Sequence, residues 1–374
     1  MAPMNRNLML LASGALMLAA GGWWVSARAD AAQHSSAANG TLPSPAQHAA
    51  NALFGEGDEA DTALVGETRA LLVLKNGKII YERYGKGFGQ DSKLISWSMA
   101  KSIMAVLTGL IISDGKLALD EPAPVPLWQR SGDPRGHITV RHLLNMASGL
   151  KYVEIANPVY DSDTVRMLFG QGAKDMAVYA ETQPAIAKPD EQFNYSTGSS
   201  VILSDILTRT LTESQDPDTR RQAMLDYFRG RLSEPLGMTS LTPEFDASGT
   251  MIGGSILHAT ARDYAKFGEF LRHRGVVNGQ RLLPESWIDF MLTSSPADGG
   301  YGGHIWLNKP RPAGSNPALW PGQGPSDLFA CLGHQGQYII VSPSQGLTIV
   351  RLGISTNTQN DAVREQLRKL TAAL

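Results

Sequence analysis

Strand-type apolar patterns concentrate at the two ends of the chain, and helix-type periodicity fills the middle. Residues 70–84, ALLVLKNGKIIYERY, form two strand-like runs around Asn76-Gly77, a dipeptide that favours a tight hairpin turn. Residues 331–354 contain two more β-rich runs, joined by the turn-forming stretch SPSQG. Helices are expected at 98–115, 198–211, 260–275, 283–292 and 361–374.

These patterns predict an α+β fold. Hairpins that lie far apart in the sequence most simply join one antiparallel sheet, made from both chain ends and flanked by helices. A mostly helical lobe is expected to be inserted over about residues 120–298. We expect the folded domain to span residues 66–374 and a binding cleft to lie between the sheet and the lobe.

The first 29 residues are typical of a secretory signal peptide. An apolar run of 18 residues ends at Val25, and Ala27-Arg28-Ala29 fits the small-x-small cleavage pattern. We therefore expect a periplasmic or secreted protein without stable membrane association after cleavage. The alternative is an uncleaved anchor, because the run reaches the short limit of a membrane span. Residues 30–65 are predicted to be a flexible linker.

Composition and missing motifs exclude several classes of function. The net charge of −2, from 33 basic and 35 acidic residues, gives no indication of nucleic-acid binding. The single cysteine, Cys331, can form neither an internal disulfide nor a thiolate metal cluster. The chain lacks H-E-x-x-H, G-x-S-x-G and the P-loop pattern. We expect no cofactor and no metal, and the sequence does not set the oligomeric state.

The stretch SWSMAKSIMA, residues 96–105, contains a candidate nucleophile and base. S-x-x-K occurs three times, but the two later copies contain a turn-forming Asp-Gly pair or a helix-breaking glycine. Only Ser98 and Lys101 open a long apolar helix, on which residues three apart are neighbours. Burial would lower the pKa of Lys101, and a neutral amine would activate the serine hydroxyl. The competing interpretation is a surface lysine at a helix start.

Two further stretches offer groups that complete an acyl transfer. Tyr195, in QFNYSTGSS, precedes a helix that Ser196 or Thr197 caps, and its phenol could move a proton if nearby cations lower its pKa. In GHQGQYIIV, His334 and two glycines precede a strand, where the backbone N–H of Gln337 could donate to an oxyanion. The ordinary alternatives are a half-buried tyrosine with a satisfied hydroxyl and a glycine-rich strand entry.

In this order, SWSMAKS, FNYSTGSS and GHQGQ resemble the three motifs of the serine β-lactamase and penicillin-binding-protein superfamily. The tyrosine motif resembles the class C-like esterase and amidase branch, which includes the 6-aminohexanoate-dimer (nylon-oligomer) hydrolases. The resemblance spans about residues 71–350 and extends to ITVRHLLNMASGL, EPLGM, HATARDYAKFG and YGGHIWLN. It implies a β-lactamase-like fold and a serine hydrolase.

The resemblance also implies catalytic roles. Ser98 would be the acylated nucleophile and Lys101 the base that activates it. Tyr195 would pass the proton to the leaving group and help to activate the deacylating water. The backbone N–H groups of Ser98 and Gln337 would form the oxyanion hole.

Substrate contacts are implied for a second set of residues. His334, Gly336 and Thr197 would line the substrate site, and Tyr160 or Tyr152 would cover the cleft. Thr197 stands where class C β-lactamases have an asparagine. His334 replaces the lysine of Lys-Thr-Gly and removes the fixed positive charge that attracts a β-lactam carboxylate.

These departures favour esters and amides over β-lactams. The sequence therefore predicts a secreted serine hydrolase that cleaves small ester or amide substrates through an acyl-serine intermediate. One alternative is a D,D-peptidase or β-lactamase that acts on cell-wall peptides or β-lactams. Another is a non-catalytic penicillin-recognising domain, which would have no need of Ser98, Lys101 and Tyr195 together.

Overall fold

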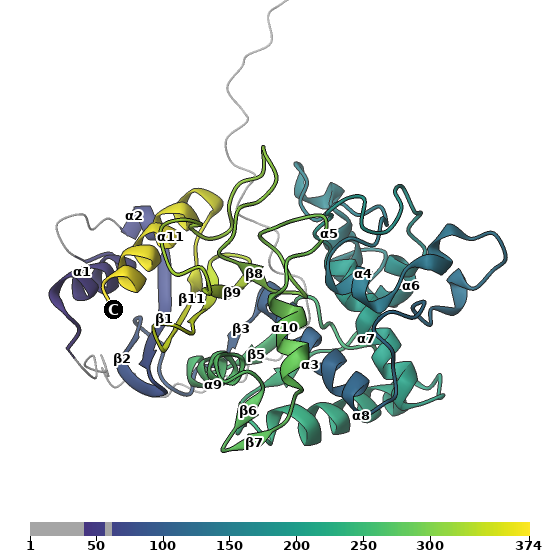
Figure 1. The fold of residues 1–374 in the computed structure, drawn as a ribbon, viewed down its shortest axis with the longest axis horizontal. Coiled ribbons are helices and arrows are strands. Elements are labelled where there is room, and N and C mark those ends of the chain that lie inside the picture. Colours follow the sequence, from purple (N-terminus) through teal and green to yellow (C-terminus); the bar gives the residue numbers. More distant parts are fainter. Residues whose placement is uncertain (1–40, 57–61) are drawn as a thin grey trace, which may run out of the picture. The chain divides into compact units, whose positions relative to one another are not determined.

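Strands from both ends of the chain pair in one six-stranded antiparallel sheet (Figure 1). The computed structural model describes residues 41–56 and 62–374, so the predicted signal peptide lies outside the described residues. The strand order is β2-β1-β11-β10-β9-β8. The bounds are β1 (Glu67–Lys75), β2 (Lys78–Tyr84), β8 (Trp306–Leu307), β9 (Phe329–Gly333), β10 (Gln337–Ser342) and β11 (Leu347–Ile354). The predicted α+β fold with a sheet from both chain ends is confirmed.

The first hairpin is closed by Asn76 and Gly77, as its sequence predicts. Both residues have positive φ, 50° and 78°, which matches the twist of a two-residue hairpin turn. β1 is a continuous apolar run because both of its faces are covered. Leu72 packs into the core on one face, and Leu71 packs into a separate apolar cluster on the other.

Helices from the two ends of the described chain cover one face of the sheet. They are α1 (Ser44–Leu53), α2 (Thr62–Val65) and α11 (Asn357–Ala372) (Figure 1). The flexible linker predicted over residues 30–65 is wrong for α1. Ala46, Ala49, Ala50 and Leu53 form its buried side, and the small alanines allow α1 to pack against α11. The alanine-rich composition that suggested a linker instead gives a helix with one apolar face.

The opposite face of the sheet is covered by α9 (Ala261–Arg272), which contacts β1, β10 and β11. Gly268 makes this close contact possible. A Cβ at this position would lie 2.7 Å from Cγ2 of Thr348 and 2.8 Å from Cγ2 of Ile339. The inserted lobe is therefore shorter than the predicted span of about 120–298, because α9 belongs to the layers of the sheet.

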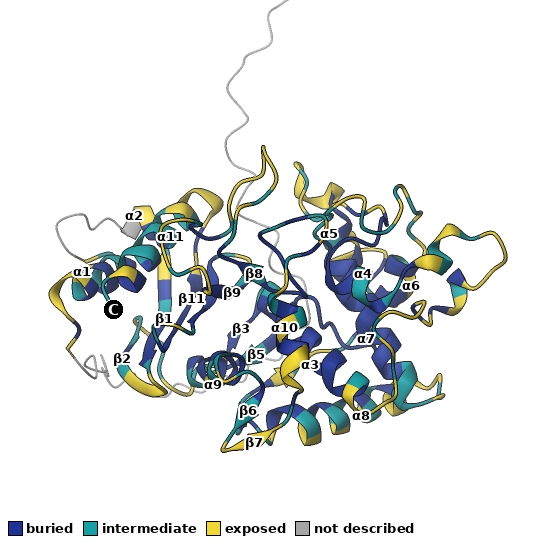
Figure 2. Ribbon diagram, viewed as in Figure 1, coloured by how far each residue is buried: buried dark blue, intermediate teal, exposed yellow. Residues whose placement is uncertain are grey.

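Two buried helices, α3 (Ala100–Ser113) and α7 (Thr197–Leu211), contact each other beside the sheet. Figure 2 shows both coloured mostly as buried, and every residue of α3 from Ala100 to Ile111 is buried. This confirms the all-round apolar pattern of the helix that follows Ser98. Within the described ranges, no helix is both long enough and apolar enough to cross a membrane.

The remaining elements are short. The helices are α4 (Val140–Leu144), α5 (Asp163–Phe169), α6 (Met176–Glu181), α8 (Pro217–Phe228) and α10 (Glu285–Leu292). The single-turn and π elements are η1 (Trp97–Met99), η2 (Pro126–Trp128), η3 (Pro134–His137), η4 (Val159–Asp161) and η5 (Arg229–Ser233). One small sheet contains β3 (Leu94–Ile95), β4 (Thr242–Pro243) and β5 (Leu257–Ala259). Another contains β6 (Val276–Val277) and β7 (Gln280–Arg281).

Candidate active site

Ser98 lies in η1, directly before α3, and Lys101 lies in the first turn of α3. The two side chains meet as predicted, with Nζ of Lys101 3.0 Å from Oγ of Ser98. Trp97, next to the serine, has a φ of 43°, which is unusual for a bulky residue. Strained backbone of this kind clusters at functional sites, so the outlier beside Ser98 supports its candidacy.

Lys101 is 1% exposed, and three groups surround its amine. In addition to Ser98, Nζ contacts Oγ1 of Thr197 at 2.9 Å and the carbonyl oxygen of Gly254 at 2.7 Å. Burial lowers the pKa of Lys101 to about 8, against the opposing charge of Glu154. A substantial fraction of Lys101 is therefore neutral near pH 8 and able to act as a base.

Tyr195 lies immediately before α7, whose N-cap is Ser196. Its ring centroid is 4.9 Å from Nζ of Lys101. The pKa of Tyr195 is raised, first by burial and then by Glu154, although the Ser98 hydroxyl lowers it. The condition given for this phenol, a pKa lowered by nearby cations, is therefore not met. The phenol stays protonated near neutral pH, so it enters a reaction as a proton donor.

Glu154 is a member of the site that the sequence analysis missed. Its Oε2 accepts the backbone N–H of Thr197 at 2.7 Å, and its Oε1 accepts the Thr197 hydroxyl at 2.6 Å. The carboxylate thus binds the first residue of α7, where a negative charge is favourable. Glu154 is 41 residues from Tyr195 in the sequence and belongs to none of the recognised motifs, so no local pattern identified it.

The position of Gln337 does not support the prediction that its backbone N–H donates to an oxyanion. It begins β10, which lies between β9 and β11, and it pairs with Gly333. Backbone N–H groups of an inner strand lie in the sheet and point at the neighbouring strands. The buried side chain of Gln337 donates to the carbonyl of Gly353 at 2.7 Å and accepts its N–H at 3.0 Å. The residue fastens the hairpin to β11.

The end of β9 approaches the serine more closely. A Cβ on Gly333 would collide with the carbonyl oxygen of Ser96, so glycine is needed for this approach. The rings of His334 and Trp97 meet edge to face, with centroids 5.5 Å apart. Among the described contacts, the backbone N–H groups of Ser98 and His334 have no acceptor. These two groups are therefore candidates for an oxyanion hole.

The His334 side chain gives the site no fixed positive charge. Its ring is exposed to solvent, yet desolvation by the surrounding protein lowers the pKa of His334, against the opposing charge of Glu154. The ring is therefore largely neutral at pH 7. Gly336, predicted to contact substrate, instead faces the buried Arg351, whose Nη1 binds the Gly336 carbonyl at 2.7 Å.

Neither predicted cleft tyrosine contacts the Ser98 group. Tyr152 is buried, and a Cβ on Gly198 would lie 2.7 Å from its ring, so Tyr152 packs beneath the start of α7. The prediction is wrong for Tyr152, because its ring fills the core. Tyr160, in η4, is 66% exposed, and its described hydrogen bond is from Arg166 to its backbone carbonyl. Its role over the cleft stays a prediction.

The beta-lactamase family profile matches residues 62–373. The chain belongs to the beta-lactamase family. Among curated proteins, the 6-aminohexanoate-dimer hydrolase of Paenarthrobacter ureafaciens is 24% identical over 233 residues. That match covers 60% of this chain and 57% of the relative, so it spans little more than half of the relative's length. The superfamily resemblance is thereby confirmed.

Solved structures of other proteins share the fold of this beta-lactamase-family chain. A penicillin-binding-protein homolog from Caulobacter crescentus has a TM-score of 0.66 at 15% identity, covering 91% of this chain and 100% of its own. A D-stereospecific amidohydrolase from Streptomyces sp. has a TM-score of 0.57 at 18% identity, covering 85% of this chain and 98% of its own. The family match and the curated hydrolase relative support a general hydrolytic role for this chain.

A second serine–base pair in this beta-lactamase-family chain is structural. Oγ of Ser200 lies 2.8 Å from Nε2 of His304, and Nδ1 of His304 donates to the carbonyl of Leu144 at 2.8 Å. Burial lowers the pKa of His304 to about 3, so its ring is neutral. Ser200 is completely buried, and no substrate can reach it. Ser98, which is only half-buried, is the better nucleophile candidate.

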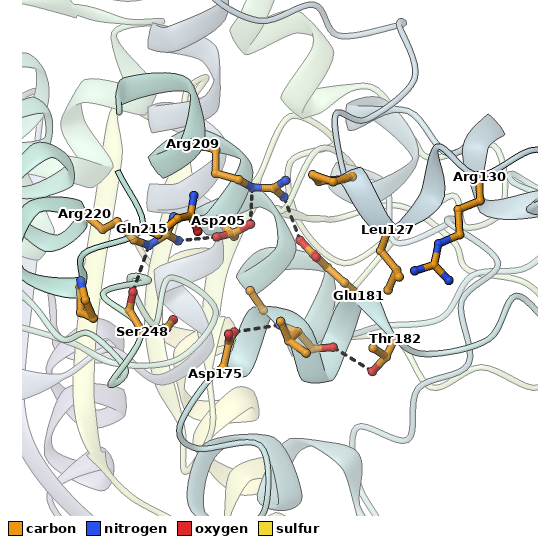
Figure 3. Close-up of a pocket in the computed structure, with 14 residues that line it drawn as sticks. Leu127, Arg130, Asp175, Glu181, Thr182, Asp205, Arg209, Gln215, Arg220 and Ser248 are labelled. Carbon is orange, nitrogen blue, oxygen red and sulfur yellow. Dashed lines mark hydrogen bonds and ion pairs between the residues drawn. The ribbon is translucent and has the colours of Figure 1, made fainter. Parts of the chain in front are cut away.

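A cavity of about 640 Å³ in the helical region is lined by an ion-pair network (Figure 3). Arg209 bridges Asp205 at 2.6 Å and Glu181 at 3.0 Å, and Arg220 binds the same Asp205 at 2.5 Å. These side chains pair with one another, although burial and the neighbouring Asp205 raise the pKa of Glu181 to about 8. The lining contains none of Ser98, Lys101 and Tyr195. Across the described residues, no group of three or more His, Cys, Asp or Glu is arranged to hold a metal.

Proposed function

We propose that this chain is a serine hydrolase that cleaves ester or amide bonds of small substrates through an acyl-Ser98 intermediate. The observation that supports it best is the 3.0 Å contact between Ser98 and the buried Lys101, whose pKa lies at about 8. A base of this pKa is largely available at mildly alkaline pH, and it is strong enough to take a proton as the serine attacks.

Acylation follows from these positions. Neutral Lys101 takes the Ser98 proton while Oγ attacks the substrate carbonyl. The carbonyl oxygen gains a negative charge and accepts hydrogen bonds from the N–H groups of Ser98 and His334. The protonated phenol of Tyr195 donates its proton to the leaving oxygen or nitrogen and recovers one from the Lys101 ammonium. The leaving group departs neutral, and Ser98 carries the acyl group.

Deacylation reverses these roles with water as the nucleophile. Lys101, again neutral, accepts a proton from the attacking water through Tyr195, and the same N–H pair holds the oxyanion. When the intermediate collapses, Oγ of Ser98 leaves and takes a proton back from the Lys101 ammonium. The acid product dissociates, and the serine is restored.

We expect esters and linear amides to be better substrates than β-lactams. A β-lactam carboxylate benefits from a fixed cation, and the group at this position is His334, which is largely neutral at pH 7. The name of the Paenarthrobacter relative, a 6-aminohexanoate-dimer hydrolase, agrees with a small substrate. From the N-terminal pattern we further propose a periplasmic or secreted location, which N-terminal sequencing of exported protein would test.

Labelling with a fluorophosphonate tests the proposal. Intact-mass spectrometry should show one adduct, which peptide mapping places on Ser98, and Ser98→Ala should abolish it. Ser200→Ala is the matched control, because Ser200 also lies beside a base but is buried, and labelling should persist. Labelling that survives in Ser98→Ala, or that is lost in Ser200→Ala, would refute the assignment of the nucleophile.

A further inference from the structure

The carboxylate of Glu154 fixes the direction of one particular hydroxyl proton. Its Oε1 lies 2.6 Å from Oγ1 of Thr197, and an ionised carboxylate can only accept hydrogen bonds. The single proton of the Thr197 hydroxyl therefore points at Glu154. Only the lone pairs of that oxygen remain for Lys101, whose Nζ lies 2.9 Å away.

This assignment determines how neutral Lys101 is oriented. A neutral amine has two N–H groups and one lone pair in addition to its bond to carbon. Thr197 Oγ1 and the Gly254 carbonyl, 2.7 Å from Nζ, are both acceptors, and they take the two N–H groups. The remaining contact of Nζ is Oγ of Ser98, at 3.0 Å. The lone pair is therefore directed at the hydroxyl that must lose its proton.

We propose that Glu154 is a positioning residue that acts through Thr197 to aim the lone pair of Lys101 at Ser98. This inference rests on the proposed function and adds a residue to it. Glu154 makes no contact with the serine itself. Its role is to keep the Thr197 hydroxyl from donating to Lys101, which would engage the lone pair needed for catalysis.

Hydrogen bonds from a neighbouring segment fix the position of the loop that contains Glu154. Nδ2 of Asn194 donates to the carbonyls of Leu150 and Tyr152, both at 3.1 Å, and so ties the start of the loop to the residue before Tyr195. The carboxylate is half-buried, and both of its oxygens are engaged by Thr197. A purely structural Glu154 would stabilise the N-terminus of α7 without affecting the base.

The charge of Glu154 has a second, separable effect. It raises the pKa of Lys101 against the effect of burial, so removing it moves the titration of Lys101 to lower pH. The titratable groups around this charge are Lys101, Tyr152, Tyr195, Tyr301 and His334, and Lys101 also faces His304. Of the two bases near the reacting serine, Lys101 and His334, only Lys101 has a described hydrogen bond with Ser98.

Glu154→Gln separates the two effects. Each carboxylate oxygen of Glu154 accepts a different group of Thr197, and glutamine replaces one of these oxygens by an NH2 donor, so in this geometry it loses one of the two acceptors. We expect the plateau of kcat/KM for a p-nitrophenyl ester to fall at least about 10-fold, through kcat more than KM. The midpoint of the acid limb should move down by about one pH unit or more. An effect of charge alone would move the midpoint without lowering the plateau.

Substitutions at Thr197 provide the second measurement. Thr197→Ser keeps the hydroxyl and should stay within a few-fold of wild type. Thr197→Val removes it and should lower the plateau as Glu154→Gln does, without the downward shift of the midpoint. Glu213→Gln is the matched control, because Glu213 is an exposed glutamate beyond the other end of α7, and it should change neither quantity.

The outcomes are distinct. An unchanged plateau in Glu154→Gln, or equal losses in Thr197→Ser and Thr197→Val, would overturn the positioning role while leaving the hydrolase mechanism intact. A wild type in which Ser98 is never acylated would instead refute the proposed function itself. A lowered plateau with a shifted midpoint in Glu154→Gln, together with rescue by serine at position 197, supports the inference.

Discussion

Replacing Lys101 by methionine should greatly slow acylation and should remove a pH-dependent contribution of Lys101 to the free energy of unfolding. Burial lowers the pKa of Lys101 from 10.5 to about 8. Below pH 8 the folded protein must hold a buried ammonium, at a cost of roughly 3 kcal/mol relative to the unfolded chain. This cost fades as pH rises from 8 to 10.5, because the folded state loses the proton first. The wild type therefore becomes more stable relative to the variant over this range.

Methionine fills the space of the lysine stem but offers no donor. Oγ1 of Thr197 and the carbonyl of Gly254 each lose a partner, which costs about 1–3 kcal/mol. At pH 7 this loss roughly cancels the relief of the buried charge, so the two proteins should have similar free energies of unfolding. At pH 10.5 the variant should be less stable by a few kcal/mol. Acylation should fall by about 10²–10⁴-fold at every pH.

Urea denaturation of both proteins between pH 7 and pH 10.5 measures the effect. The difference between their free energies of unfolding should change by roughly 3 kcal/mol across this range. Lys116→Met is the matched control, because Lys116 is exposed just beyond the same helix, and its difference from wild type should stay constant. Parallel pH curves for wild type and Lys101→Met would show that burial does not lower the pKa of Lys101.

Four further changes test the site and the fold. Tyr195→Phe should slow acylation of Ser98 by an amide by about 10²–10⁴-fold but acylation by a p-nitrophenyl ester far less, because nitrophenolate leaves without a proton; equal losses in single-turnover acylation assays would contradict this. His334→Lys should raise kcat/KM for a chromogenic cephalosporin relative to the ester by roughly 10–100-fold, and a wild type that prefers the cephalosporin would restore the β-lactamase assignment. Leu53→Ala should lower the free energy of unfolding by about 2–5 kcal/mol, and an unchanged denaturation curve would mean that α1 does not pack. Gly268→Val should cost about 1–3 kcal/mol by overpacking α9 on the sheet, with activity per folded molecule retained.

Local patterns were enough to predict the features that depend on neighbours in the sequence. Asn76-Gly77 specifies its own hairpin turn, because few other residues adopt positive φ readily. The apolar circumference of α3 and the three-residue spacing of Ser98 and Lys101 are likewise properties of one helical segment. The contact between these two residues could therefore be predicted without any knowledge of the rest of the fold.

Features that depend on distant segments were decided by the tertiary structure. The alanines of α1 resemble a linker until α11, some 300 residues later, covers them. Gln337 resembles a site residue in its motif, but strand pairing places it inside the sheet. Glu154 has no recognisable motif, and only the approach of its loop to α7 makes it a partner of Thr197. The sequence alone determined the candidate nucleophile and its candidate base, which share one helical segment. The tertiary structure decided what surrounds that base, because the direction of a lone pair depends on hydrogen bonds from three separate parts of the chain.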